Sequence, residues 1–315
     1  MTAPTTLRVA YATYAQDPAD PDPDLDAVLV SGALREHGAD CEPLRWDDPD
    51  VRWSDWDVVL IRSTWNYAAD RVAFLDWAAA VSQSSLLLNP LDIVTWNTDK
   101  TYLRDLADSG VPTIPTWWCP PGDRPPDRRS MRNLTGVVGL DAAAWVAKPA
   151  VGAGARGALR FADDDVGWQR LHDHVASLHA QGQQVMVQPY LRAVDSSGEA
   201  AVVVIDGQVS HAVRKVAALT CGGHGDARGL TTLTPAMHAL VGRVREAMAD
   251  RWDACVYARV DMVSTGAAEE DPAGRMVVME CELTEPLLFC YLAPAGAEAL
   301  AAAVVRRAGK ARRTR

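Results

Sequence analysis

The 315-residue sequence lacks the features that would assign it to a membrane, secreted or nucleic-acid-binding class. Its longest apolar candidate, Ala293 to Val305, is alanine-rich and too short to cross a bilayer. No charged-then-apolar signal peptide is recognisable, and the six cysteines form no CxxC pair, so reduced thiols in a cytoplasmic protein are expected. With 31 basic against 41 acidic residues, the net charge of −10 argues against nucleic acid or a membrane as partner. We therefore expect a small-molecule ligand.

The composition is otherwise that of an ordinary globular protein. Hydrophobic residues make up 48% of the chain, and its length favours two or three subdomains over one. Basic residues gather between Arg306 and Arg315, and so short a run at a chain end is expected to be a frayed, solvated tail. We find no internal repeat.

The first third of the sequence alternates short β-rich runs with segments of helical apolar spacing. Strands are expected at 8–13, 57–64 and 86–89, and helices at 25–37, 70–81 and 98–109. The run DVVLIRST, from Asp57 to Thr64, has the continuous apolar pattern of a buried strand. This alternation predicts a small parallel α/β layer.

From about Thr113 the pattern changes to strands joined by hairpins. Further strands are expected at 113–118, 145–149, 158–161, 185–191, 200–205 and 209–216. The Asp206-Gly207 pair is a strong turn signal and predicts a β-hairpin from Glu199 to Val216. We expect the Pro- and Arg-rich stretch 124–132 to be a surface loop and the Gly-rich stretch 221–229 to be mobile.

Two lysines and a glycine-rich loop form the first group of residues that suggests chemistry. Lys100 ends TWNTDK, and Lys148 opens KPAVGAGARG, which contains Gly152, Gly154 and Gly157. Lysine is a compact charge suited to phosphate oxygens, and a loop with little side-chain bulk lets backbone N–H groups approach a triphosphate. A plain β-turn is the alternative. Dinucleotide binding is disfavoured, because the glycines lie between two expected strands rather than between a strand and a helix.

Carboxylates on two late strands form the second group. In YARVDMV and MVVMECEL, alternation places Arg259 and Asp261 on one strand face and Glu280 and Glu282 on another. Burying such a cluster without a partner is costly, whereas Mg²⁺ prefers a few carboxylates together with phosphate oxygens. A metal-nucleotide site resolves that cost. The alternative is a sheet edge whose carboxylates face solvent.

The order of these features resembles that of the ATP-grasp carboxylate-amine ligases, from about Thr95 to Pro286. The signature is ARVD followed by ExE and a proline. The resemblance implies an α/β fold, α+β in its C-terminal half, in which a small parallel α/β domain precedes two α+β subdomains that clasp ATP. It implies an N-terminal domain at 1–94, a central subdomain with a glycine lid at 95–190 and a C-terminal subdomain with a metal site at 191–315.

The same resemblance implies roles for individual residues. Mg²⁺ would be held by Asp261, Glu280 and Glu282, and the catalytic residues would be Arg259, Arg214 and Lys148. The ATP-binding residues would be Lys100, Lys148, Gly152, Ala153, Gly154, Ala155, Gln188, Pro189, Tyr190, Leu191, Asp195 and Glu199. For Arg214 and Lys215, which lie in HAVRK, an exposed hairpin pair is the alternative reading.

Within the superfamily, the strings RSTWNY, TWNTDK, QPYL and SHAVRK are similar to those of the O-ureido-D-serine cyclo-ligases of D-cycloserine biosynthesis. RSTWNY follows a buried strand, so its polar groups are expected at the carboxyl end of the parallel layer, where open α/β sheets bind ligands. Arg62 would hold a substrate carboxylate in a bidentate contact. The expected substrate-binding residues are Arg62, Ser63, Thr64, Trp65, Asn66 and Lys215. Packing of Trp65 and Tyr67 at a domain interface is the alternative.

We therefore expect an ATP- and Mg²⁺-dependent carbon-nitrogen ligase of antibiotic biosynthesis that converts an amino-acid carboxylate to an acyl phosphate. A nitrogen then displaces the phosphate, within the same molecule in a cyclo-ligase or from a second amino acid in a dipeptide ligase. A nucleotide-binding protein without turnover is a third possibility, disfavoured because both lysines, the arginine and the three carboxylates occur together. The resemblance also implies a homodimer, while the identity and stereochemistry of the substrate stay open.

Overall fold

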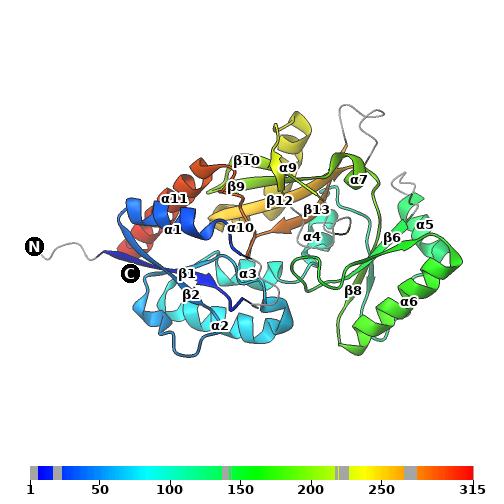
Figure 1. The fold of residues 1–315 in the computed structure, drawn as a ribbon, viewed down its shortest axis with the longest axis horizontal. Helices are drawn as coiled ribbons and strands as arrows, with labels where there is room; N and C mark the ends of the chain where they lie inside the picture. The colour runs from blue at the N-terminus through cyan, green and yellow to red at the C-terminus, as the bar shows by residue number, and fades with distance from the viewer. Residues whose placement is uncertain are drawn as a thin grey trace, which may run out of the picture.

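Three β-sheets form the framework of the molecule. The computed structural model describes residues 6–16, 23–136, 142, 144–216, 219, 227–265 and 275–314. Figure 1 shows the N-terminal sheet at the lower left, a five-stranded sheet above it and a four-stranded sheet at the right. Most of the stretch 221–229, which we expected to be mobile, lies outside the described residues. Among the described helices, none is both long and apolar enough to span a membrane.

The N-terminal sheet is parallel, as predicted, with the strand order β2-β1-β3-β4. Its strands are β1 (Leu7–Thr13), β2 (Ala39–Arg45), β3 (Val58–Ile61) and β4 (Leu86–Leu88). The helices of this layer are α1 (Ala27–Glu36) and α2 (Arg71–Ser84), with short 3₁₀ turns at Trp53–Asp55 and Tyr67–Ala69. All four residues of β3 are buried, which fits its uninterrupted apolar sequence. The strand that was not predicted, β2, is an edge strand of mostly exposed, polar residues.

Two short helices, α3 (Leu91–Asn97) and α4 (Tyr102–Asp108), replace the single helix expected at 98–109. They brace the edge strand of the five-stranded sheet, β13 (Met276–Glu282). The Asn97 side chain donates to the Cys281 carbonyl at 2.7 Å and accepts from the Leu283 backbone N–H at 2.7 Å. The Tyr102 hydroxyl accepts from the Cys281 N–H at 2.9 Å. These bonds satisfy backbone groups that a buried edge would otherwise leave unpaired.

The four-stranded sheet is antiparallel, with the order β5-β8-β6-β7. It contains β5 (Trp117–Cys119), β6 (Ala144–Pro149), β7 (Leu159–Ala162) and β8 (Val185–Pro189), covered by α5 (Arg128–Gly136) and α6 (Asp165–Ala180). The expected loop at 124–132 was wrong in its second half. Helix α5 begins at Arg128, where Asp127 Oδ1 accepts from the Ser130 N–H at 2.7 Å.

The five-stranded sheet has the order β11-β10-β9-β12-β13. Its other strands are β9 (Glu199–Ile205), β10 (Gln208–Lys215), β11 (Ala227–Leu230) and β12 (Tyr257–Ser264), and the nearby helices are α7 (Ala193–Ser197), α9 (Pro235–Met248) and α10 (Asp250–Ala254). The predicted hairpin is confirmed, since β9 and β10 pair on either side of Asp206 and Gly207. Both turn residues have positive φ, 47° and 77°, as a two-residue hairpin turn requires.

A bulge interrupts the pairing of β12 with β13 beside the predicted carboxylates. Asp261 pairs with Glu280 but the next residue, Met262, pairs with Val278, so Met279 is an extra, unpaired residue. A bulge redirects the side chains around it. Met279 and Glu280, although adjacent in sequence, therefore both line the same pocket.

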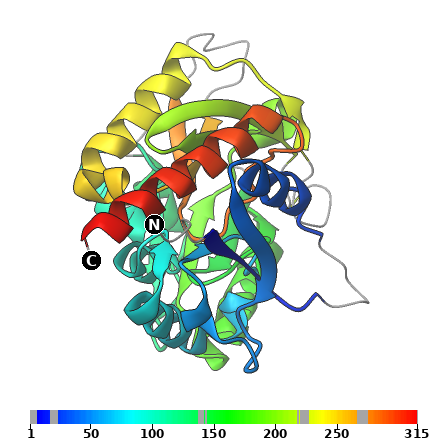
Figure 2. The same ribbon diagram turned by 90° about the vertical axis from the view of Figure 1, so that its left-hand side faces the viewer.

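The C-terminal helix α11 (Pro294–Thr314) joins the N-terminal layer to the five-stranded sheet. Figure 2 shows α11 running beside α1, and one apolar cluster contains Val9 of β1, Val203 of β9 and Leu300 of α11. The expected frayed basic tail was wrong, because Arg307 donates to the Asp206 carboxylate and to the carbonyls of residues 253–255. The division at 1–94, 95–190 and 191–315 stays a prediction. The first boundary falls inside α3.

Candidate functional site

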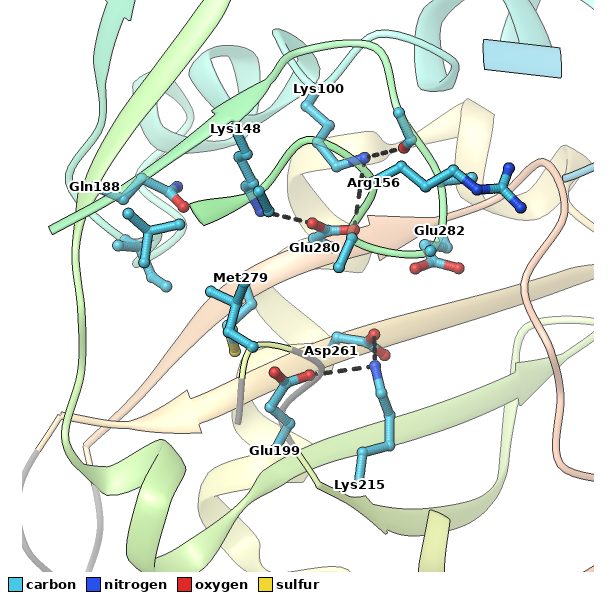
Figure 3. Close-up of a pocket in the computed structure, with 18 of the residues that line it drawn as sticks. Lys100, Lys148, Arg156, Gln188, Glu199, Lys215, Asp261, Met279, Glu280 and Glu282 are labelled. Atoms are coloured by element: carbon cyan, nitrogen blue, oxygen red, sulfur yellow. Dashed lines mark hydrogen bonds and ion pairs between the residues drawn. The ribbon is translucent and has the colours of Figure 1, made fainter. Parts of the chain in front are cut away.

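One pocket collects residues from the four-stranded and five-stranded sheets and from the turn that follows β3. Its walls come from the turn after β3, from β6 and its glycine loop, from the end of β8, and from β9, β10, β12 and β13. Figure 3 shows lysines and carboxylates from opposite walls pointing toward one another. The pocket therefore lies where the sheets meet, as a site that clasps a ligand between subdomains requires.

The two predicted phosphate-binding lysines converge on one carboxylate. Lys148 Nζ donates to Glu280 Oε1 at 2.7 Å, and Lys100 Nζ lies 3.7 Å from Glu280 Oε2 and donates to the Gly152 carbonyl at 2.6 Å. Burial disfavours the charged form of Glu280, but Lys100 and Lys148 outweigh it and hold the pKa of this carboxyl well below its usual range. Lys148 on β6 and Lys100 between α3 and α4 thus face the carboxylate of Glu280 on β13.

Arg259 is held in a fixed orientation by two carboxylates on its own side of the pocket. Its Nε and Nη2 donate to the two oxygens of Asp261 at 2.8 and 2.9 Å, and Nη2 donates to Glu282 Oε1 at 2.6 Å. Nη1 donates to the Leu287 carbonyl at 2.9 Å. The predicted alternation of β12 and β13 is confirmed for Arg259, Asp261 and Glu282, which contact one another. A planar guanidinium fixed in this way presents directed donors to an oxyanion.

Lys215 completes the charged wall from β10. Its Nζ donates to Asp261 Oδ2 at 2.6 Å and lies 3.2 Å from Glu199 Oε2. Burial raises the cost of charging Asp261, yet Arg259 and Lys215 lower the pKa of its carboxyl. Asp261 is therefore an anion between two cations.

Two further carboxyls have the opposite tendency. Burial is the main reason why the pKa of Glu282 is raised, and Asp261 and Glu280 add to it although Arg259 opposes them. Burial, followed by repulsion from Glu282, raises the pKa of Glu285 to about 8. The pocket thus contains two carboxyls whose pKa is lowered, Asp261 and Glu280, and two whose pKa is raised, Glu282 and Glu285.

The glycine loop after β6 bends back over the lysines. Gly154, Ala155 and Gly157 have positive φ, which suits glycine, and a Cβ at Gly157 would come within 3.2 Å of Pro149. Arg156, in the same loop, donates to the Trp65 carbonyl at 3.3 Å. The loop therefore forms a cover between β6 and the N-terminal layer.

The end of the pocket nearest β8 is apolar. Ile114, Val146, Leu191 and Met279 line it. The Gln188 side chain donates to Thr116 Oγ1 at 2.8 Å, and residues 188–191 all line the pocket. Such a surface suits a flat, weakly polar ring that is recognised through the backbone.

Most of the predicted site residues line this one pocket. They are Trp65, Lys100, Lys148, Gly152, Ala153, Gly154, Ala155, Gln188, Pro189, Tyr190, Leu191, Glu199, Lys215, Arg259, Asp261, Glu280 and Glu282. Residues more than 200 positions apart, such as Trp65 and Glu282, are therefore brought together as predicted.

Arg62 was placed wrongly among the pocket residues. Its side chain is buried behind the pocket wall, where Nη2 donates to the Pro286 carbonyl at 2.6 Å and lies 3.9 Å from Asp26 Oδ2. Its guanidinium carbon lies 4.8 Å from the centre of the Tyr257 ring. The carboxyl end of β3 was predicted to face the ligand, but residues 284–289 cover Arg62 there.

Three neighbours of Arg62 do not line the pocket either. Ser63 donates to Thr13 Oγ1 at 2.9 Å, and Thr64 is fully buried. Asn66 accepts from Trp46 Nε1 at 2.6 Å, so it holds the N-terminal layer together. Of RSTWNY, only Trp65 and Tyr67 face the ligand space.

Arg214 and Asp195 also lie outside the pocket lining. Because successive strand residues point to opposite faces, Arg214 cannot share the direction of Lys215, and it donates instead to the Ser197 carbonyl. Asp195 accepts from the Tyr190 hydroxyl at 2.5 Å. Both residues make their contacts around α7 (Ala193–Ser197).

Several lining residues were not predicted. They are Tyr67, Asn97, Tyr102, Ile114, Val146, Pro149, Arg156, Ala158, Val194, Leu219, Met279, Glu285, Leu287 and Phe289. Tyr67 was assigned only to packing, and the apolar members look like ordinary core residues in the sequence. Glu285 could have been predicted as a site residue, because it directly precedes the signature proline, Pro286.

The carboxylates of β12 and β13 fit Mg²⁺ in the chemistry of their donors. Asp261 lies directly opposite Glu280, and Arg259 lies opposite Glu282. In the described part of the chain, no three such side chains are already gathered around a common point. Asp261, Glu280 and Glu282 would hold the ion together with phosphate oxygens, in place of some of their present lysine and arginine contacts.

Comparisons of sequence point to one group of proteins. The model of the N-terminal domain of D-cycloserine synthetase DcsG matches residues 9–89. The cycloserine biosynthesis protein DcsG of Streptomyces lavendulae is 34% identical over 200 residues, which are 64% of this chain. That alignment spans 65% of the length of the relative.

Comparisons of structure extend the likeness to nearly the whole chain. The crystal structure of D-cycloserine synthetase DcsG superposes with a TM-score of 0.82 and 31% identity, over 96% of this chain and 99% of that one. D-alanine–D-alanine ligase from Bacillus anthracis, solved with ATP, has a TM-score of 0.63 and 16% identity, over 98% of this chain and 99% of that one. The second likeness concerns the fold alone.

Proposed function

Because the chain belongs to the family of D-cycloserine synthetase DcsG and has the fold of the ATP-grasp ligases, we propose that it uses ATP to activate an amino-acid carboxylate and joins it to nitrogen. The observation that carries this proposal is the single pocket in which Lys100, Lys148 and Arg259 face the carboxylates of β12 and β13. A nucleotide-binding protein without turnover would not need Arg259 fixed by two carboxylates at the same place as the phosphate lysines.

The adenine base is proposed to lie at the apolar end, between Val146, Leu191 and Met279. The backbone of residues 188–191 would read its polar edge. The triphosphate would then extend toward Lys100 and Lys148 beneath the glycine loop. Mg²⁺, when bound, would neutralise phosphate charge and orient the transferred group.

The reaction begins with attack of the substrate carboxylate on the γ-phosphate, which gives an acyl phosphate and ADP. Lys100 and Lys148 hold the phosphates in place, and Arg259 stabilises charge on the transferred group. A nitrogen then attacks the acyl carbon, the C–N bond forms, and phosphate leaves with the electrons of the C–O bond. The loop 152–157 keeps water away from the acyl phosphate.

We propose O-ureido-D-serine as the substrate and D-cycloserine as the product, because the chain is similar over nearly its whole length to a D-cycloserine synthetase, with 31% identity. In this reaction the nitrogen bound to oxygen closes the ring onto its own acyl phosphate. The carbamoyl group must then leave with one water, as carbon dioxide and ammonia. Ammonia release therefore distinguishes this reaction from dipeptide formation.

The test is to incubate the full chain with ATP, Mg²⁺ and O-ureido-D-serine, and to measure ADP, phosphate, ammonia and D-cycloserine. Ring closure predicts equal amounts of ADP and D-cycloserine. ADP formed with pairs of ordinary amino acids, together with a dipeptide and no ammonia, would favour the intermolecular alternative. No ADP with any amino acid would refute the ligase proposal.

Two further expectations belong with this proposal. A cytoplasmic location agrees with the five described cysteines, all of which are free thiols. A homodimer stays a prediction from the resemblance. Size-exclusion chromatography with light scattering would test it.

A further inference from the structure

Glu285 is a buried carboxyl in the pocket wall that makes no direct hydrogen bond or ion pair with the described part of the chain. The other charged residues that line the pocket all make ion pairs or hydrogen bonds with their side chains. Among the described residues, no hydrogen bond or ion pair reaches the Glu285 carboxyl, although the residue is only 9% exposed. A buried carboxyl without a partner is costly, and at a binding site a ligand is the natural partner.

The position of Glu285 is fixed through its backbone. Trp65 Nε1 donates to the Glu285 carbonyl at 2.8 Å, and the carbonyl of the nearby Leu287 accepts from Arg259 Nη1 at 2.9 Å. The residue therefore lies between the N-terminal layer and Arg259. This is where a small substrate would meet the transferred phosphoryl group.

We propose that Glu285 binds the α-ammonium group of the substrate and so selects a zwitterionic amino acid. This inference rests on the proposed function. In an α-amino acid the nitrogen is separated from the reacting carboxyl carbon by a single carbon atom, so a group that binds the ammonium must lie close to the phosphoryl-transfer residues. Glu285 meets this requirement. A cation beside it favours the ionised carboxylate, so substrate and residue stabilise each other.

Two substrates that differ only at the α-carbon test the assignment. The first is O-ureido-D-serine and the second is 3-(ureidooxy)propanoic acid, the same molecule with hydrogen in place of the amino group. Release of ADP by the full chain gives kcat/KM for each. In Glu285→Gln, we expect kcat/KM for the amino acid to fall by about 10- to 100-fold, as for loss of a charge-assisted hydrogen bond. The value for the desamino compound and the KM for ATP should stay unchanged.

A second variant separates charge from shape. Glu285→Asp keeps the negative charge and should recover part of the lost kcat/KM for O-ureido-D-serine only. Equal losses on both substrates, or no loss on either, would overturn the role of Glu285 and leave the ligase proposal intact. A wild-type enzyme that releases no ADP with any amino acid would refute the ligase proposal and this assignment with it.

Discussion

At the scale of single residues, Glu280 gives the most direct test of the site, because it faces both phosphate lysines and is one of the proposed metal ligands. We expect Glu280→Gln to lower kcat by about 100-fold or more at ordinary Mg²⁺, since an amide coordinates magnesium poorly. Steady-state ADP release would measure this. Glu298→Gln, on the exposed side of α11, is the control and should keep full activity. Near-normal turnover by Glu280→Gln would contradict the metal assignment.

The raised pKa of Glu285 predicts how the stability of the protein depends on pH. Its pKa of about 8 lies above that of an unfolded glutamate, so the folded chain keeps this proton while the unfolded chain loses it. As pH rises from 6 to 8 the wild type must lose stability that Glu285→Gln retains. The stability advantage of the variant should therefore grow by on the order of 2 kcal/mol across this range. Urea unfolding of both proteins at the two pH values, without ligand, would measure it, and a constant difference would show that Glu285 titrates normally.

The residues that could be predicted from the sequence are those whose chemistry admits few other uses. A lysine that ends TWNTDK, a second lysine before a glycine-rich loop, and carboxylates on apolar strands favour phosphate and metal over a plain β-turn or a solvent-facing sheet edge. Arg62 was placed wrongly because its direction depends on residues 284–289, which lie more than 200 positions away. Arg214 was placed wrongly because Arg214 and Lys215 are consecutive residues of β10, so their side chains point to opposite faces and only Lys215 lines the pocket.

At the scale of elements, the bulge in β13 determines how the apolar end of the pocket is built. Met279 faces the pocket only because it is the unpaired residue of the bulge. Met279→Ala should weaken ATP binding by about five- to tenfold through loss of buried apolar contact. Met276→Ala, on the same strand but outside the pocket lining, is the matched control. Calorimetry on both variants would decide it, and equal effects would contradict a base-contacting role for Met279.

Elements with a clear local signal were predicted well. The parallel strands β1, β3 and β4 and the Asp206-Gly207 hairpin are examples. Helices α6, α9 and α11 were not predicted, although Asp164 and Thr234 accept hydrogen bonds at the N-termini of α6 and α9. The bulge could not be predicted, because its position depends on the pairing of β12 with β13. The apolar periodicity of a sequence describes each strand by itself and does not show how two strands pair.

At the scale of the whole molecule, Arg307 anchors the C-terminal helix. Its guanidinium donates to Asp206 Oδ1 at 2.8 Å and to the carbonyls of Asp253, Ala254 and Cys255 at 2.6 to 2.9 Å. Arg307→Ala should lower the free energy of unfolding by about 2 kcal/mol or more, because these acceptors lose their donor. Arg313→Ala should change it little, since Arg313 donates only within the helix. Urea denaturation would compare them, and a loss no greater than that of Arg313→Ala would argue against the anchor.

The apolar cluster shared by β1, β9 and α11 has a mechanical consequence. Two of the three sheets are joined through one core, so they act as a single frame that ligand binding cannot easily deform. The four-stranded sheet has its own cluster under α6, around Trp145 and Leu171, and residues of β6 and β8 also belong to clusters that include residues of the five-stranded sheet. An opening of the pocket that moves the four-stranded sheet away from the five-stranded sheet would part Lys148 from Glu280.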